Sequence, residues 1–256
     1  MNGLISFLFG GKTLLKISLL TQNIYQDLES KNTEMIIKSS VIAAKEQKSC
    51  LLLTPELSLQ GFPINLEKPI KPISSNRINQ IKKAAFEYDI SIGFGFFEQQ
   101  AGKIYNAYCI IDPKGNIVGL QRKRKTFKLA KEDLFIQSGT ETKDFVLAGM
   151  KTRIVICFGL RFPSLFQSES ENPQLYIIPA NWPKTRIHHW EALLTARAIE
   201  TQAWVIGINR TKGIYNGHSL VINPNGEVVE KANEGLLSLT LNEEMVSAIR
   251  KDFPIK

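Results

Sequence analysis

The chain has few of the residues that build metal or disulfide sites. Its three cysteines, Cys50, Cys109 and Cys157, include no CxxC pair, so structural zinc is not expected. Adjacent His188 and His189 cannot share a helix face as metal ligands do, so no metal ion is expected. Without a disulfide framework, we expect a cytoplasmic location. No apolar run approaches the ~18 residues of a membrane-spanning helix, so a membrane partner is not expected.

The charge is unbalanced but dispersed. The 256 residues carry 32 Lys and Arg against 24 Asp and Glu, a formal net charge of +8, and the run Gln121–Lys125 has four consecutive cations. A nucleic-acid groove would also need stacking aromatics and further basic clusters, which are lacking around this run. We therefore favour a solvated surface and expect no nucleic-acid partner. The hydrophobic content of 43% predicts an ordered globular chain rather than a disordered one.

Apolar periodicity predicts alternating strands and helices, with hairpins between them. This mixture indicates one α/β domain, a pair of mixed sheets covered by helices, over residues 13–256, with residues 1–12 as an N-terminal extension. The irregular stretches Phe62–Asn76 and Phe127–Thr142 are typical of functional loops. Predicted strands are Lys16–Asn23, Cys50–Thr54, Ile90–Phe97, Ala107–Asp112, Ile117–Gln121, Thr152–Cys157, Leu175–Pro179, Ala203–Asn209, Ser219–Ile222 and Leu236–Leu241, and predicted helices are Ser30–Glu46, Arg77–Tyr88 and Arg186–Gln202.

Three chemically useful side chains follow predicted strands. Cys157 ends the apolar run TRIVIC, Glu56 follows CLLLTP, and the cations 122–125 follow Ile117–Leu120. The carboxyl ends of strands are where reacting groups collect in α/β proteins. Each residue also has a structural interpretation: a buried thiol, a surface-turn glutamate and a solvated loop. Because strand residues alternate faces, at least one of the four cations must point toward the sheet.

A thiol, an ammonium and a carboxyl form a complete set for amide hydrolysis. A thiolate is the nucleophile, and an adjacent ammonium lowers the thiol pKa and stabilises the oxyanion of the tetrahedral intermediate. The carboxylate takes the proton, passes it to ammonia and then activates water. Partial burial near Leu57, Leu59 and Phe62 would hold the pKa of Glu56 up.

Five segments in this order resemble the carbon–nitrogen hydrolase (nitrilase) superfamily. They are LLLTPELSLQGFP, GLQRKRKTF, IVICFGLRFP, PANWPKTRIHHWEALLTARAIETQAWVIGINRTKG and YNGHSLVINPNGEVV. The match runs from about Leu15 to Leu241 and is closer to the omega-amidase branch than to true nitrilases.

The resemblance implies a four-layer α-β-β-α sandwich, a homodimer and no cofactor. It makes Glu56 the general base, Lys123 the oxyanion-stabilising lysine and Cys157 the nucleophile, and Glu132 the glutamate that positions the lysine and proton transfers. The backbone N–H of Phe158 would be the second oxyanion donor, and Arg161 would support the cysteine turn. Asn181 and Trp182 would line the acyl pocket.

The implied activity is hydrolysis of the terminal amide of a small omega-amidodicarboxylate, such as 2-oxoglutaramate, through a thioester. Three positions depart from the family pattern: Gly159 replaces an aspartate, Lys125 a histidine, and Ser164 an acidic or large residue. These changes make the site more positive. Two alternatives stay open: a related amidase acting on deaminated glutathione or N-carbamoyl compounds, and a catalytically silent member that binds a ligand or partner.

Overall fold

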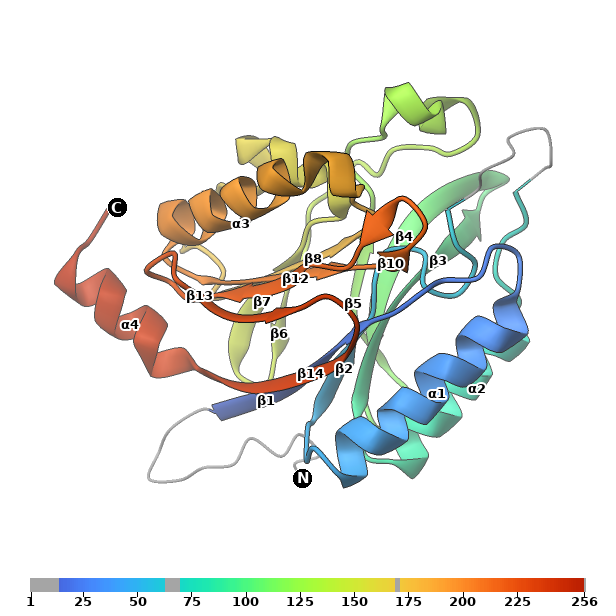
Figure 1. The fold of residues 1–256 in the computed structure, drawn as a ribbon, viewed down its shortest axis with the longest axis horizontal. Helices are drawn as coiled ribbons and strands as arrows, with labels where there is room; N and C mark the ends of the chain where they lie inside the picture. The colour runs from blue at the N-terminus through green and yellow to red at the C-terminus, as the bar shows by residue number, and fades with distance from the viewer. Residues whose placement is uncertain (1–13, 63–69, 169–170, 256) are drawn as a thin grey trace.

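The computed structural model describes residues 14–62, 70–168 and 171–255. Two six-stranded sheets pack face to face, with α1 and α2 on the outer face of one and α3 on the outer face of the other (Figure 1). The predicted α-β-β-α sandwich is therefore confirmed. The predicted extension, residues 1–12, lies outside the described residues.

The first sheet holds the N-terminal half of the chain and one late strand. Its order is β14-β1-β2-β3-β4-β5, in which β1, β2 and β3 run parallel and the outer pairs are antiparallel. Helices α1 and α2 pack side by side on it. The bounds are β1 Leu14–Thr21, α1 Glu29–Lys45, β2 Leu51–Leu53, α2 Ser75–Glu87, β3 Ser91–Gln100, β4 Lys103–Ile111, β5 Ile117–Arg122 and β14 Gly235–Asn242.

The second sheet has the order β13-β12-β9-β8-β7-β6, with β7, β8 and β9 parallel. A short hairpin, β10–β11, follows β9, and α4 extends from β14 toward the C-terminus (Figure 1). The bounds are β6 Asp144–Leu147, β7 Met150–Ile154, β8 Leu175–Ala180, α3 Ile187–Thr201, β9 Trp204–Asn209, β10 Thr211–Lys212, β11 Tyr215–Asn216, β12 Ser219–Ile222, β13 Val228–Ala232 and α4 Glu243–Asp252.

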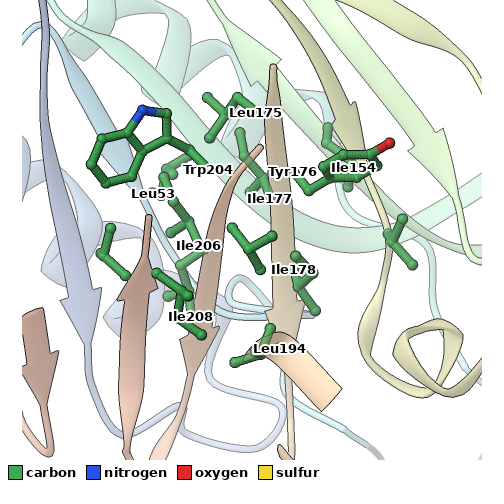
Figure 2. Close-up of a cluster of buried hydrophobic side chains, with 14 of the residues drawn as sticks. Leu53, Ile154, Leu175, Tyr176, Ile177, Ile178, Leu194, Trp204, Ile206 and Ile208 are labelled. Carbon is green, nitrogen blue, oxygen red and sulfur yellow. The ribbon is translucent and has the colours of Figure 1, made fainter. Parts of the chain in front are cut away.

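The larger core lies between the sheets and continues under α3. Central parallel strands are buried on both faces, which is why they read as continuous apolar runs. Figure 2 shows Leu53 of the first sheet beside Ile177 and Ile206 of the second, with Leu194 of α3 nearby. A second cluster fills the space under α1 and α2. These cores fix the strand ends at which the candidate residues lie.

Strand β7 ends earlier than the sequence predicts. The run Thr152–Cys157 was expected to be a strand, but β7 ends at Ile154 and Cys157 opens the 3-10 turn η3, Cys157–Arg161. Cys157 itself cannot belong to a strand, because its φ of 42° is left-handed. The predicted β4–β5 hairpin is confirmed.

In the described part of the chain, no helix is both long and apolar enough to span a membrane.

Candidate active site

The three candidate residues lie just beyond strands of both sheets. Glu56 comes three residues after β2, Lys123 directly after β5, and Cys157 three residues after β7. Their side chains line one cavity of about 620 Å³. All three are buried, with exposed fractions of 1%, 1% and 8%, so the pocket brings together residues that are distant along the chain.

Four donors hold the carboxylate of Glu56. Its Oε1 accepts from Lys123 Nζ at 2.8 Å and from Asn106 Nδ2 at 2.8 Å. Its Oε2 accepts from the backbone N–H of Asn181 at 3.0 Å and from Asn181 Nδ2 at 3.1 Å. These hydrogen bonds fix the orientation of both oxygens. Glu56 is thereby presented to the cavity in one orientation.

A glycine of the neighbouring strand allows Glu56 to take this place. A Cβ atom on Gly95 of β3 would lie 2.2 Å from the backbone nitrogen of Leu57 and 3.0 Å from the carbonyl carbon of Glu56. Real Cβ atoms do not approach backbone so closely, because the atoms would overlap. The tight turn after β2, in which Leu57 has a φ of 49°, therefore depends on glycine at this position.

Lys123 is placed between two carboxylates. Its Nζ lies 2.8 Å from Glu56 Oε1 and 2.7 Å from Glu132 Oε1, and the other oxygen of Glu132 accepts from the backbone N–H of Phe127 at 2.6 Å. Burial by itself lowers the pKa of Lys123, but the charges of Glu56 and Glu132 together raise that pKa above its usual value. Lys123 is therefore a fixed ammonium.

Burial acts in the opposite direction on the pKa of Glu132. Burial raises the pKa of its carboxyl, and the charge of Glu56 raises it further, while Lys123 acts to lower it. The net direction is upward. Glu132 contacts Lys123, the residue that the family resemblance pairs it with.

The Cys157 thiol is less acidic than we expected. Burial raises its pKa well above the usual value, and the charge of Glu56 adds to this, outweighing the ammonium of Lys123. The expectation of a lysine-lowered pKa is therefore wrong in direction for the unliganded site. A nucleophilic thiolate here would have to form by proton transfer to a carboxylate as the sulfur attacks.

The predicted acyl-pocket residues also line the cavity. The ring of Phe158 lies near that of Phe127, with centroids 4.9 Å apart, and Asn181 and Trp182 line the same cavity. The buried Oδ1 of Asn181 has no hydrogen-bond partner within the described residues. A polar atom in this state is suited to a ligand that donates a hydrogen bond.

Arginines occupy two places around the cysteine turn. Arg197 of α3 donates from Nε and Nη2 to the carbonyl oxygen of Leu160 in η3, at 3.3 Å, and pairs with Glu200. Arg161, at the end of η3, instead points along the cavity wall toward Trp182 and His189. The contact that supports the turn carbonyl thus comes from Arg197.

Sequence reasoning missed one hydrogen-bond partner of Glu56, Asn106, and two residues that line the cavity, Arg186 and Tyr215. Asn106 and Tyr215 were not singled out, and Arg186 was taken only as the start of a helix. Asn106 is a buried polar residue in the apolar strand KIYNAYCII, which is a signal that could have been used.

Two of the departures from the family pattern, Gly159 and Lys125, lie in or close to the cysteine turn without breaking the contacts of Glu56, Lys123 and Glu132. A Cβ on Gly159 would lie 2.9 Å from Val155 Cγ1, so the glycine allows η3 to pack tightly on the end of β7. The Nζ of Lys125 lies 5.0 Å from the ring centroid of Phe162.

Among the described residues, no group of three His, Cys, Asp or Glu side chains is arranged to hold a metal ion.

Comparison with known proteins agrees with this geometry. Residues 16–251 match the family model for carbon-nitrogen hydrolases. The chain belongs to the carbon-nitrogen hydrolase family. It is 31% identical over 235 residues to the 2-oxoglutaramate amidase of Bacillus subtilis, covering 88% of this chain and 91% of that protein.

Two further relatives show the same relationship. This carbon-nitrogen hydrolase is 29% identical over 251 residues to the omega-amidase YafV of Yersinia enterocolitica, covering 94% of each chain. Its fold superposes on a carbon-nitrogen hydrolase superfamily protein of Xanthomonas campestris with a TM-score of 0.86 at 24% identity, over 94% of this chain and 95% of that one. The protein is therefore an enzyme of the nitrilase superfamily, as its motifs predict.

Proposed function

We propose that this hydrolase cleaves the terminal amide of a small omega-amidodicarboxylate, such as 2-oxoglutaramate, and releases ammonia. Support comes from two relatives, named 2-oxoglutaramate amidase and omega-amidase. The observation that carries the proposal is the buried contact of Lys123 with Glu56 and Glu132 in the cavity that also contains Cys157.

In the first half-reaction, Cys157 Sγ attacks the amide carbon while its proton passes to Glu56. The carbonyl oxygen becomes an oxyanion that Lys123 Nζ and the backbone N–H of Phe158 stabilise. Asn181 Oδ1 accepts a hydrogen bond from the substrate NH₂ group. When the C–N bond breaks, Glu56 returns the proton to nitrogen, ammonia leaves and a thioester remains on Cys157.

In the second half-reaction, water attacks the thioester. Glu56 takes a proton from the water, and the tetrahedral oxyanion forms at the same two donors. The C–S bond then breaks, and Glu56 gives its proton to the leaving sulfur, which regenerates the thiol and the carboxylate. The net change is an amide and water giving an acid and ammonia. Glu132 keeps Lys123 oriented through both steps, because one of its oxygens contacts Nζ and the other is fixed by Phe127.

The substrate's free carboxylate needs a cationic site, and the cavity contains one. Arg161 and Arg186 line the wall and lie close enough for Arg186 to lower the pKa of Arg161, after the larger effect of burial. Neither arginine pairs with a carboxylate among the described residues. Two neighbouring guanidinium groups without an acid are suited to bind a carboxylate.

The experiment is an ammonia-release assay with 2-oxoglutaramate. Wild-type protein should release ammonia, Cys157→Ala should not, and Cys109→Ala, a matched change at a cysteine buried in the other core, should retain activity. Ammonia release by Cys157→Ala at the wild-type rate would refute the nucleophile. No release by wild-type protein would refute the substrate class.

The size of the cavity favours one second candidate. A volume of about 620 Å³ falls within the ~300–1,000 Å³ range of pockets that enclose drug-sized ligands, and its mouth carries the exposed Leu129 and Ile214. Larger amides, such as deaminated glutathione, would therefore fit. A panel that compares kcat/KM for 2-oxoglutaramate, deaminated glutathione and an N-carbamoyl amino acid separates the two candidates.

A further inference from the structure

Arg161 is held by two uncharged groups rather than by an acid. Its guanidinium carbon lies 4.9 Å from the ring centroid of Trp182, and its Nη2 lies 3.1 Å from Nδ1 of His189. Trp182 is itself fixed, because its indole N–H donates to the carbonyl oxygen of Arg186 at 2.8 Å. The orientation of Arg161 along the cavity wall therefore depends on the Trp182 ring and on the His189 imidazole.

The state of His189 follows from this contact. A guanidinium group has donors and no acceptor, so Nδ1 of His189 must be the acceptor and the proton of the neutral ring must be on Nε2. A protonated imidazole carries hydrogen on both nitrogens and has no lone pair to offer. The contact with Arg161 exists only while His189 is neutral.

The surroundings of His189 keep it neutral. On α3 its neighbour is His188, with ring centroids 4.2 Å apart, and η3 and η5 (Lys184–Arg186) present Arg161 and Arg186. The strands packed on α3, β9 and β12, contain no charged residue. Partial burial and these three basic groups lower the pKa of His189, and no carboxylate opposes them.

We propose that His189 is a positioning residue for substrate recognition: its neutral ring holds Arg161 in the orientation that, with Arg186, binds the carboxylate of the substrate. This inference rests on the proposed anionic substrate and adds a residue outside the catalytic group. Protonation of His189 removes the acceptor and places a cation beside Arg161, which then turns away from the cavity. Recognition of anionic amides therefore has a pH dependence of its own, which the ratio of the kcat/KM values of an anionic and a neutral amide isolates from the pH dependence of the chemical step.

Protonated His189 would also attract the substrate carboxylate directly, which is an opposing effect. His189 is partly exposed, so solvent screens this attraction. A charge-assisted hydrogen bond from a positioned arginine is worth on the order of tenfold or more in affinity. The loss of Arg161 orientation is expected to outweigh the added charge.

The test compares two five-carbon amides, glutaramate, which ends in a carboxylate, and pentanamide, which ends in a methyl group. At pH 8, His189→Leu should raise KM for glutaramate about tenfold with little change in kcat, and should leave pentanamide unaffected. His189→Asn should restore the wild-type KM, because Asn Oδ1 can replace Nδ1 as acceptor. His188→Asn is the matched control and should behave as wild type.

The pH profile supplies the second readout. In wild-type protein the ratio of kcat/KM for glutaramate to that for pentanamide should fall as pH drops through the His189 titration, and in His189→Asn it should stay flat. Because Asn cannot titrate, a purely structural role for His189 would not produce this difference.

Direct binding covers the case in which pentanamide turnover is too slow to measure. In a Cys157→Ala background, the Kd for glutaramate should rise about tenfold with His189→Leu and return with His189→Asn. An unchanged Kd and KM in His189→Leu, while wild-type protein hydrolyses glutaramate, would overturn the role of His189. If wild-type protein neither binds nor hydrolyses glutaramate, the proposed function itself fails.

Discussion

The ammonium nitrogen of Lys123 lies 2.8 Å from Oε1 of Glu56, although the two residues are 67 positions apart in the sequence. Both side chains are 1% exposed. This contact joins the end of β5 to the end of β2 across two intervening strands of the same sheet.

Replacing Glu56 with glutamine tests its role in proton transfer. Glu56→Gln keeps the shape of the side chain but cannot take the thiol proton, so kcat for ammonia release should fall on the order of 10²- to 10⁴-fold. The matched control is Glu98→Gln, which removes a carboxylate that pairs with Arg122 at the same sheet. If Glu56→Gln kept more than a tenth of the wild-type kcat, Glu56 would not be the general base.

Replacing Lys123 with methionine tests the buried ion group. Lys123→Met leaves two carboxylates buried without a cation, which should lower the free energy of unfolding by about 3–5 kcal/mol. Arg122→Met breaks a partly exposed pair and should cost about 0–1 kcal/mol. Denaturant unfolding measures both, and equal losses would contradict the assigned burial.

The same variant has a pH signature. The pKa of Glu132 in the folded chain is raised above its usual value of 4.5. At a pH between the usual pKa and the raised pKa, the folded chain therefore binds more protons than the unfolded chain. Stability contributed by this group therefore falls as pH rises through that window. Without Lys123 the pKa of Glu132 rises further, so the deficit of Lys123→Met should be smaller at pH 5 than at pH 8. A deficit that grew on acidification would contradict this.

Most central strands could be predicted from the sequence because burial on both faces leaves a continuous apolar run, whereas the choice of Glu56, Lys123 and Cys157 as one group came from the family resemblance. The two edge strands of the second sheet, β6 and β13, were not predicted: β13, VVEKA, has four exposed residues and so lacks the alternation that marks a half-buried strand. Helix α4 was also missed, although Asn242 caps it by accepting from the backbone N–H of Glu244.

Site electrostatics was less predictable than site membership. The sequence shows that Lys123 and Cys157 share a pocket only through resemblance, and it does not show how deeply the sulfur is buried. The direction of the Cys157 pKa depends on that burial and on the position of Glu56, which are properties of the folded chain.

The raised pKa of Cys157 makes a prediction for thiol reactivity. Alkylation of the unliganded protein by iodoacetamide should accelerate continuously from pH 7 to pH 9, because the neutral thiol predominates at neutral pH. Peptide mapping should find label on Cys157 before Cys109, because Cys157 opens to the cavity and Cys109 is enclosed in the other core. A reaction rate that is already constant below pH 6 would show a preformed thiolate instead.

Gly95 should be intolerant of any side chain. Gly95→Ala places a methyl group 2.2 Å from the backbone nitrogen of Leu57, which must displace Glu56. We expect a loss of about 1–3 kcal/mol in the free energy of unfolding, together with lost amidase activity. Gly102→Ala, where nothing lies within 4 Å of the new atom, should keep its activity. Wild-type activity in Gly95→Ala would refute the close approach.

Mass spectrometry of the protein quenched during turnover of 2-oxoglutaramate addresses the covalent mechanism itself. The mechanism predicts an acyl group, equal in mass to the substrate minus ammonia, on the peptide that contains Cys157, and none on that peptide in Cys157→Ala. Turnover with no adduct on Cys157, or an adduct on Cys50 or Cys109 that persists in active Cys157→Ala protein, would contradict it.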